Sequence, residues 1–282
     1  MGRPPDFIGL GAQKAGTSWI YACLYEHPQI YAPVKEIHFF SRERNWQKGF
    51  VWYEKFFEDC PPGAKTGEFS TSYFCDPHTP ERISKRYPEV KLIVSLRNPI
   101  DRAYSNYIND IIAGKLSPRT PFDEALQRHP EYLEQGHYMR FLERYLRHFT
   151  REQILILIYE DSLRDPHNFI RSIYQFIEID DSFVPSMLFR KVNPGRIPRL
   201  VWFDQLIDKL SKLIQRKGLQ QLWWLAKQAG IGHRLRAMNT RGLKRTREEL
   251  NSSDRERLFV LFEKDVEALE RVLGRKLNEW RP

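Results

Sequence analysis

A short glycine-containing segment near the N-terminus combines residue types that bind an anion. It reads Gly11-Ala12-Gln13-Lys14-Ala15-Gly16-Thr17-Ser18. Small residues let the backbone approach a phosphate, Lys14 supplies a cation, and Thr17 and Ser18 supply hydroxyl groups. The segment departs from the G-x-x-x-x-G-K-[ST] pattern of P-loops, because Lys14 precedes Gly16 instead of following it. Two glycines alone would indicate only a turn, but the whole combination favours an anion-binding loop.

A carboxylate and an imidazole stand close together further along the chain. Glu36 and His38 are separated by one residue in the run Lys35-Glu36-Ile37-His38-Phe39-Phe40. In an extended segment, side chains at such positions face the same side. Either group can remove a proton from a hydroxyl within hydrogen-bond reach. The alternative is structural, with Glu36 in a surface ion pair with Lys35 and His38 half-buried with its polar atoms satisfied.

An arginine follows the strongest strand signal in the first half of the chain. Residues 91–96 are nearly all apolar, and Arg97 comes directly after them. Open α/β sheets bind ligands at the carboxyl ends of their strands, where a guanidinium can clamp a phosphate with two hydrogen bonds. Ser105 lies on the helix expected to follow. Arg97 could instead be a plain ion-pair partner. Arg102 is the competing phosphate ligand, but we expect it to pair on the helix surface.

Apolar runs alternate with helical patterns through the first two thirds of the chain. The strands are predicted at residues 7–10, 91–96 and 154–158, and the helices at residues 17–26, 101–112, 138–149 and 166–177. Strands that are apolar throughout are typical of parallel sheets covered on both faces. Their alternation with helices therefore predicts an α/β fold, a three-layer parallel sheet that carries a P-loop-like loop.

The pattern changes after Asn193, where proline and glycine interrupt the chain. Helical spacing returns over residues 202–213 and around Trp223-Trp224, in a basic region. A final helix is expected to be capped by residues 251–254 and to end before Gly274. We predict one domain over residues 1–282, with an α/β core of residues 1–193 and a mainly helical extension of residues 194–282.

Net charge, cysteine content and the length of apolar runs indicate which partners and which cellular location to expect. The formal net charge of +9 favours anionic partners, but no nucleic-acid-binding signature accompanies it. Three cysteines without a CxxC pair argue against a disulfide framework and a structural zinc site. No run approaches the roughly 18 apolar residues of a membrane span, and the N-terminus lacks a secretory signal pattern. We therefore expect a cytoplasmic protein without a membrane span.

The loop also carries a family resemblance. Gln13-Lys14-Ala15-Gly16-Thr17-Ser18-Trp19 resembles the 5′-phosphosulfate loop of sulfotransferases that use 3′-phosphoadenosine 5′-phosphosulfate (PAPS). Other matching segments, in the same order, are His27-Pro28-Gln29, residues 35–40, Trp52-Tyr53, Gly67-Glu68, Tyr73-Phe74, Arg97-Asn98-Pro99, Gly136-His137-Tyr138 and residues 154–157. The ordered set is similar to the heparan-sulfate sulfotransferase branch and its bacterial relatives.

The resemblance implies a sulfotransferase with PAPS as co-substrate and no metal. The acceptor would be a hydroxyl of a glycan, a lipid, or a small-molecule or carrier-bound alcohol. Glu36 would be the general base, with His38 assisting or orienting it. Lys14 would stabilise the charge that develops on the departing nucleotide.

The same resemblance implies the nucleotide contacts. Residues Gln13 to Ser18 would bind the 5′-phosphosulfate, and Arg97 with Ser105 the 3′-phosphate. Arg245 would match a C-terminal arginine that closes over the nucleotide, although a solvated charge run is the alternative there. One residue departs from the pattern: Phe69 stands where glycan-modifying members commonly have a lysine. This departure weakens the case for a glycan acceptor.

Two other functions fit part of the sequence. A kinase shares phosphate-binding loops, but it needs Mg²⁺, with a hydroxyl residue after the loop lysine and a carboxylate at a strand end. Here Ala15 follows Lys14 and Arg97 follows the strand, which disfavours a kinase. A non-catalytic module that binds anionic glycans or lipids would use the basic surface and would have no need of Glu36.

Overall fold

The structure is a computed structural model that describes residues 2–190, 197–198, 240–241 and 250–282. The chain divides into two units. The first contains residues 1–103, 130–193 and 252–282, and the second contains residues 104–129 and 194–251. The loop, the Glu36 segment and Arg97 all belong to the first unit.

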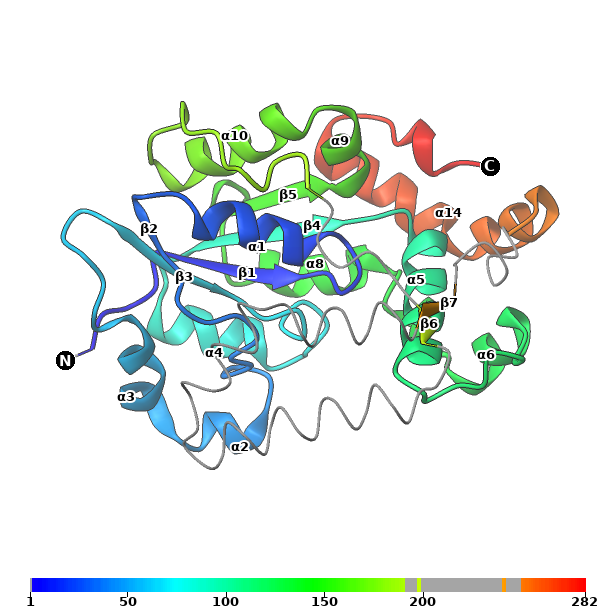
Figure 1. Cartoon of the computed structure of the whole chain (residues 1–282), viewed down its shortest axis with the longest axis horizontal. Helices are drawn as coiled ribbons and strands as arrows, with labels where there is room; N and C mark the ends of the chain where they lie inside the picture. The colour runs from blue at the N-terminus through cyan, green and yellow to red at the C-terminus, as the bar shows by residue number, and fades with distance from the viewer. Residues whose placement is uncertain (1, 191–196, 199–239, 242–249) are drawn as a thin grey trace. The chain divides into compact units, whose positions relative to one another are not determined.

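Five parallel strands form the sheet of the first unit (Figure 1). They are β1 (Phe7–Gly11), β2 (Ile30–Tyr31), β3 (Lys65–Phe69), β4 (Lys91–Leu96) and β5 (Ile154–Ile158), in the spatial order β2-β3-β1-β4-β5. Both neighbours of β1 pair with it in parallel, so the loop after β1 leaves the sheet at its centre. The predicted α/β parallel sheet is confirmed.

Helices cover both faces of this sheet. On one face, α1 (Thr17–Tyr25) and α10 (Pro166–Ile177) share a hydrophobic cluster with Phe7, Ile93 and Leu157 of the strands. Figure 1 shows α4 (Thr79–Arg86) and α8 (Tyr138–Leu146) behind the sheet, on the face opposite α1. Helix α14 (Ser252–Leu273) packs against α8. The first unit therefore has three layers.

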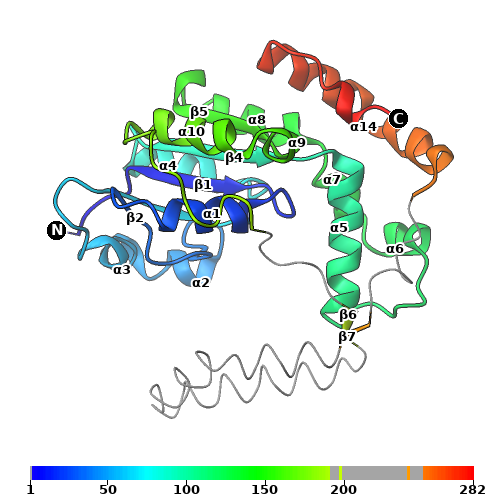
Figure 2. The ribbon, with the colours of Figure 1, turned by 45° about the horizontal axis from the view of Figure 1, so that its top comes forward.

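Shorter elements complete the two units. In the first unit these are α2 (Glu43–Trp46), α3 (Gly49–Glu54), η1 (Lys55–Phe57), α7 (Glu131–Glu134), η2 (Arg151–Gln153), α9 (Tyr159–Arg164) and η4 (Asn278–Trp280). Helix α5 (Pro99–Ile112) is one continuous helix (Figure 2), of which residues 99–103 belong to the first unit and residues 104–112 to the second. The second unit also contains α6 (Phe122–Arg128) and an antiparallel pair, β6 (Ile197–Pro198) and β7 (Thr240–Arg241).

Two phenylalanine–glycine pairs set the spacing between β1 and β3. The register places Phe7 opposite Gly67 and Gly9 opposite Phe69. A Cβ atom on Gly67 would lie 2.3 Å from Phe7 Cζ, and one on Gly9 would lie 2.0 Å from Phe69 Cδ1. Each ring therefore lies against the glycine of the neighbouring strand, and neither position has room for a larger residue.

The C-terminus fixes the turn after β4. Asn98 donates from Nδ2 to the carbonyl of Trp280, at 3.0 Å, and its backbone N–H donates to Glu160 Oε1 at 2.9 Å. The indole Nε1 of Trp280 donates to Glu160 Oε2 at 2.9 Å. Because Glu160 bridges Asn98 and Trp280, the residue after Arg97 is held at both its backbone and its side chain.

Several expectations from the sequence are confirmed, and others are wrong. The strands at 7–10, 91–96 and 154–158 exist, and the final helix ends before Gly274, which has φ of 67°. Helix α8 ends at Leu146 and not near 149. Arg102 is fully buried and donates to Gln135 Oε1 and the carbonyl of Tyr132, so the expected surface pairing is wrong. The expected helices at 202–213 and near Trp223 lie outside the described residues, and the proposed domain boundary stays a prediction.

Gly67→Ala should destabilise the protein by about 1–3 kcal/mol, because its methyl group would overlap the Phe7 ring. Urea unfolding measures this change. Adding Phe7→Leu should recover part of the loss, since the smaller side chain removes the overlap. An unchanged unfolding free energy for Gly67→Ala would contradict this account of the β1–β3 spacing.

Candidate functional site

The loop after β1 ends in an uncapped helix. Gly16 is the N-cap of α1, with φ of 80°, and no side chain caps the helix or places an acidic group in its first turn. The first N–H groups of a helix have no intrahelical carbonyl to bond, and the helix dipole is positive at this end. The N-terminus of α1, with Thr17 and Ser18, therefore offers donors to an anion.

Strand β4 holds the loop in place. The N–H of Ala12 donates to the carbonyl of Ser95 at 2.7 Å, and the hydroxyl of Ser95 donates to the carbonyl of Ala15 at 2.7 Å. Arg97, directly after the same strand, donates from Nη1 to the carbonyl of Lys14 at 3.4 Å. The structure thus brings Arg97 to the loop, as its position after an apolar strand suggested.

Tyr159 connects Arg97 to the glycine of the loop. The guanidinium of Arg97 lies 5.1 Å from the centroid of the Tyr159 ring. A Cβ atom on Gly16 would lie 2.6 Å from Cδ2 of the same ring. Arg97 Nε is buried and has no hydrogen-bond partner among the described residues. Among the described residues, the guanidinium is therefore held by the face of the Tyr159 ring and a long hydrogen bond to Lys14, which leaves donor capacity for an anion.

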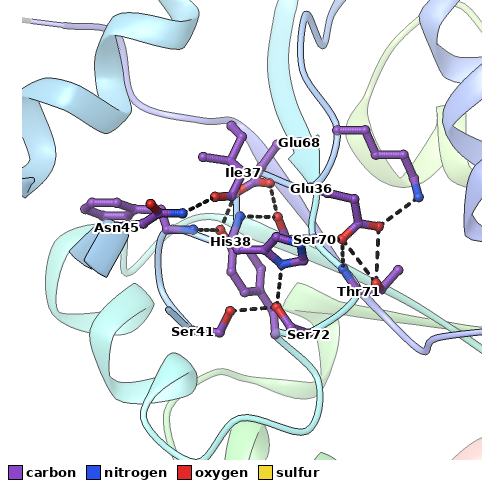
Figure 3. Close-up of polar contacts among 12 residues, drawn as sticks. Glu36, Ile37, His38, Ser41, Asn45, Glu68, Ser70, Thr71 and Ser72 are labelled. Atoms are coloured by element: carbon purple, nitrogen blue, oxygen red, sulfur yellow. Dashed lines mark hydrogen bonds and ion pairs between the residues drawn. The ribbon is translucent and has the colours of Figure 1, made fainter. Parts of the chain in front are cut away.

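Glu36 is held by groups from two directions (Figure 3). Its Oε2 accepts the backbone N–H of Thr71 at 3.0 Å, and the Thr71 hydroxyl lies 3.1 Å from both carboxylate oxygens. Its Oε1 accepts from Lys35 Nζ at 2.9 Å. Thr71 follows β3, so the carboxylate is fixed at the carboxyl end of the sheet.

Lys35 joins the Glu36 carboxylate to the loop. Its ammonium donates to Glu36 Oε1 at 2.9 Å and to Ser18 Oγ at 3.3 Å. Thr71 also lies against the loop, since a Cβ atom on Gly11 would be 3.0 Å from its carbonyl oxygen. The anion-binding loop and the Glu36 carboxylate therefore form one site within the first unit.

His38 belongs to a chain of hydrogen bonds that ends on Glu36. Its Nε2 lies 3.2 Å from Glu36 Oε2, and its Nδ1 lies 2.6 Å from Ser72 Oγ, which is 2.6 Å from Ser41 Oγ. An ionised carboxylate only accepts, so Nε2 carries the proton. In the neutral imidazole Nδ1 then accepts from Ser72, and Ser72 accepts from Ser41. The chain orients the imidazole toward Glu36.

Electrostatics favour an ionised Glu36 and a neutral His38 near pH 7. Burial by itself would raise the pKa of Glu36, but the hydrogen bond and charge of Lys35, with the Thr71 N–H, bring it below its ordinary value. Burial lowers the pKa of His38 more than the Glu36 charge raises it. A carboxylate beside a neutral imidazole can accept a proton from a bound hydroxyl.

The three candidate catalytic residues share an uncommon backbone conformation. Among the described non-glycine residues, only Lys14, Glu36, His38 and Glu178 have a positive φ, at 68°, 63°, 54° and 61° respectively. Glu178 is the C-cap of α10, where a left-handed residue is common. The other three are the residues for which a chemical role was predicted. Such strained positions cluster at functional sites, where the surrounding structure holds them.

Sequence reasoning missed the groups that hold Glu36 and His38. Thr71 and Ser72 supply the hydroxyl and N–H contacts, and neither was a candidate. The signal was present as three consecutive hydroxyl residues, Ser70-Thr71-Ser72, directly after Gly67-Glu68-Phe69. It was overlooked because β3, which is not an apolar run, was not recognised as a strand.

The remaining predicted ligands, and Phe69, differ in where they lie in the structure. Gln13 is exposed in the loop, and Ala15 is buried beneath it. Ser105 lies on α5 in the second unit, and its role stays a prediction. Arg245 lies outside the described residues. Phe69 is 1% exposed in the hydrophobic cluster beneath α1.

Neither a metal-binding group nor a membrane-spanning helix is found among the described residues. No group of three or more His, Cys, Asp and Glu residues in this part of the chain is arranged to hold a metal ion. The expectation that no metal is required stays a prediction. Of the helices in the same ranges, none combines the length and apolarity needed to cross a membrane.

The sulfotransferase domain family matches residues 4–223. This match covers well over half of the chain, so the chain belongs to the sulfotransferase domain family, in agreement with the resemblance of its motifs.

Individual relatives support the same family. Heparan sulfate glucosamine 3-O-sulfotransferase 5 of Mus musculus is 30% identical over 185 residues, which are 62% of this chain and 54% of that protein. The 3-O-sulfotransferase 3B1 of Mus musculus is 32% identical over 183 residues, covering 61% of this chain and 46% of that protein. The chain thus spans about half the length of the curated relatives it matches. A crystal structure of a sulfotransferase from Alicyclobacillus acidocaldarius superposes with a TM-score of 0.71 and 26% identity, covering 99% of this chain and 100% of that one.

Gly16→Ala should destabilise the protein by about 1–3 kcal/mol more than Gly63→Ala, because only at position 16 does the new methyl group overlap a neighbouring ring. The two glycines are matched in backbone conformation, with φ of 80° and 81°, but nothing lies within 4 Å of a Cβ at Gly63. Urea unfolding of both variants measures the difference. Equal losses would show that Tyr159 does not restrict the loop.

Proposed function

We propose that this chain transfers a sulfuryl group from PAPS to an acceptor hydroxyl, with Glu36 as the general base. The observation that carries the proposal is the Lys35 bridge, in which one ammonium contacts both Glu36 and Ser18 of the loop. A base and a phosphosulfate-binding loop must lie this close for the acceptor oxygen to reach the sulfur. Membership of the sulfotransferase domain family supports the same reaction.

The donor would be bound at both of its anionic ends. Residues Gln13 to Ser18 and the N-terminus of α1 would bind the 5′-phosphosulfate. Arg97 would bind the 3′-phosphate, since it lies beside the loop and its buried Nε has no partner among the described residues. We assign Ser105 to the same phosphate and Arg245 to closure over the nucleotide, as the family resemblance implies.

The reaction would move one sulfuryl group and one proton. The acceptor oxygen forms a bond to sulfur while the bond between sulfur and the bridging phosphate oxygen breaks. The electron pair of that bond leaves with adenosine 3′,5′-bisphosphate, and the Lys14 ammonium stabilises the developing charge. The acceptor proton passes to the Glu36 carboxylate.

His38 would orient the base instead of accepting the proton itself. Its Nε2–H donates to Glu36 Oε2, while Ser72 and Ser41 fix the opposite edge of the imidazole. This leaves Glu36 as the group whose protonation changes during transfer.

The acceptor is an alcohol, and three kinds fit the family: a glycan, a lipid, and a small-molecule or carrier-bound alcohol. Phe69 places an apolar, buried side chain where glycan-modifying members commonly carry a lysine, which weakens the glycan case. A cytoplasmic location stays a prediction from the sequence. Transfer that required ATP and Mg²⁺ in place of PAPS would favour the kinase alternative.

Glu36→Gln should lower kcat by about 100-fold or more, because the amide cannot accept the acceptor proton. Its affinity for adenosine 3′,5′-bisphosphate should stay within about twofold of the native value, since the loop is unchanged. Radiolabelled sulfate transfer to a panel of alcohols measures the first quantity, and calorimetry the second. The exposed Glu89, changed to Gln, is the control.

Full transfer activity in Glu36→Gln would show that another group is the base. Binding of the nucleotide without transfer by the native protein, over glycans, phenols, lipids and hydroxyacyl carriers, would instead favour a non-catalytic binding module.

Lys35→Met should move the acid limb of the pH–rate profile to higher pH. The Lys35 ammonium favours the ionised carboxylate, so its removal raises the pKa of Glu36 and reduces the fraction of active base at acidic pH. Lys35→Arg, which keeps a cation at this position, should leave the limb near its native position. The profile of kcat/KM from pH 4 to 9 measures the shift. An acid limb that does not move in Lys35→Met would mean that a group other than Glu36 controls it.

A further inference from the structure

The Glu68 carboxyl group is completely buried, with 0% exposure, on β3. It accepts three hydroxyl hydrogen bonds: from Tyr53 at 3.2 Å and Tyr73 at 2.6 Å on Oε1, and from Ser70 at 2.6 Å on Oε2. Burial raises its pKa to about 7. Burying a carboxyl group costs free energy that an apolar residue would not, so its presence calls for a reason other than stability.

Two of the three hydroxyl groups also hold the backbone of the Glu36 segment. Ser70 Oγ accepts the N–H of His38 at 2.9 Å, and the Tyr73 hydroxyl accepts the N–H of Phe39 at 2.8 Å. Each hydroxyl has a single proton, which it donates to Glu68. Its lone pairs are thereby directed at the two N–H groups. Glu68 therefore fixes the direction of both hydrogen bonds to the segment.

The segment held in this way is the strained one. Glu36 and His38 have φ of 63° and 54°, the left-handed region that is unfavourable for residues other than glycine. The N–H of Glu36 is also bound, donating to the carbonyl of Phe69 at 2.7 Å. Three N–H groups between Glu36 and Phe39 are thus held by β3 and the residues that follow it. Without these anchors the segment would relax toward a lower-energy backbone.

We infer that Glu68 is a positioning residue, which acts through Ser70 and Tyr73 to hold residues 36–39 in the conformation that directs Glu36 and His38 into the site. The inference rests on the proposed function, because it concerns the placement of the proposed base. In this role Glu68 acts on the segment only through the hydroxyl groups of Ser70 and Tyr73.

Tyr73→Phe and Tyr53→Phe form a matched pair that tests this role. Both tyrosines are fully buried and donate to the same oxygen of Glu68, but only the Tyr73 hydroxyl also binds the segment. Tyr73→Phe should lower kcat about tenfold or more, because the base is misplaced, whereas Tyr53→Phe should stay within about threefold of the native kcat. KM for PAPS should change little in either variant. Ser70→Ala, which removes the partner of the His38 N–H, should behave like Tyr73→Phe.

A second readout needs no catalysis. The ring signals of His38, assigned with His38→Gln, report its contact with Glu36 by NMR. They should shift toward those of a solvated imidazole in Tyr73→Phe and stay at their native positions in Tyr53→Phe. Urea unfolding of both variants separates this effect from a general loss of stability.

The results distinguish the inference from the proposed function. Native kcat and native His38 signals in Tyr73→Phe would overturn the positioning role. The positioning role would also be overturned if Tyr73→Phe and Tyr53→Phe lost kcat equally and in proportion to their loss of stability. If the native protein transferred no sulfuryl group, the proposed function would fail, while the His38 signals would still decide whether the Glu68 network holds the segment.

Discussion

The parallel pairing of β3 with β1 is the constraint on which the site depends. It continues beyond the strands, since the N–H of Ser70 donates to the carbonyl of Gly9 at 3.0 Å and that of Phe74 to the carbonyl of Leu10 at 3.0 Å. Residues 70–74 therefore lie beside the end of β1, where the loop begins. The same pairing places Thr71 beside Gly11, so that the group that holds Glu36 and the loop that would hold an anion share one edge of the sheet.

The backbone of this site is strained at three positions, and hydrogen bonds from neighbouring segments hold each of them. Lys14, Glu36 and His38 each adopt a left-handed backbone, and each is held by residues in or directly after a strand. The carbonyl of Lys14 accepts from Arg97, which follows β4, while the Glu36 and His38 N–H groups donate to Phe69 and Ser70. The strained backbone of each of these three residues is therefore held in place by hydrogen bonds to other segments of the fold.

The sequence predicted the parts of this arrangement that depend on local pattern. The apolar runs of β1, β4 and β5 are buried on both faces, and such runs are recognisable without any knowledge of the fold. Strand β3 has the sequence Lys-Thr-Gly-Glu-Phe and was not recognised. Its glycine is buried because the Phe7 ring covers it, and its glutamate because three hydroxyl groups surround it. Both reasons lie in distant segments, as does the reason that Arg102 is buried against Tyr132 and Gln135.

In the candidate site, too, some residues could be predicted from local sequence and others depend on distant segments. Lys14, Glu36, His38 and Arg97 could be selected from residue type, spacing and family resemblance, and the structure gathers all four in the first unit. The residues that hold them could not be selected. Thr71 and Ser72 reach the site because of the parallel register of β3, and Tyr159 reaches it because it directly follows β5. Ser105 and Arg245 were chosen by resemblance alone, and their roles stay predictions.

The structure also shows where the Phe69 side chain lies relative to the Glu36 segment. On β3, Phe69 faces the α1 side of the sheet, where its ring lies against Gly9, whereas Glu68 and Ser70 face the Glu36 segment. The lack of a lysine at position 69 does not deprive the site of a cation, because Lys35 places its ammonium between Glu36 and Ser18 from a different segment. Lys35 therefore supplies a positive charge beside the proposed base. An acceptor hydroxyl brought to Glu36 would therefore also lie near the Lys35 ammonium, because that ammonium contacts both the proposed base and Ser18 of the loop.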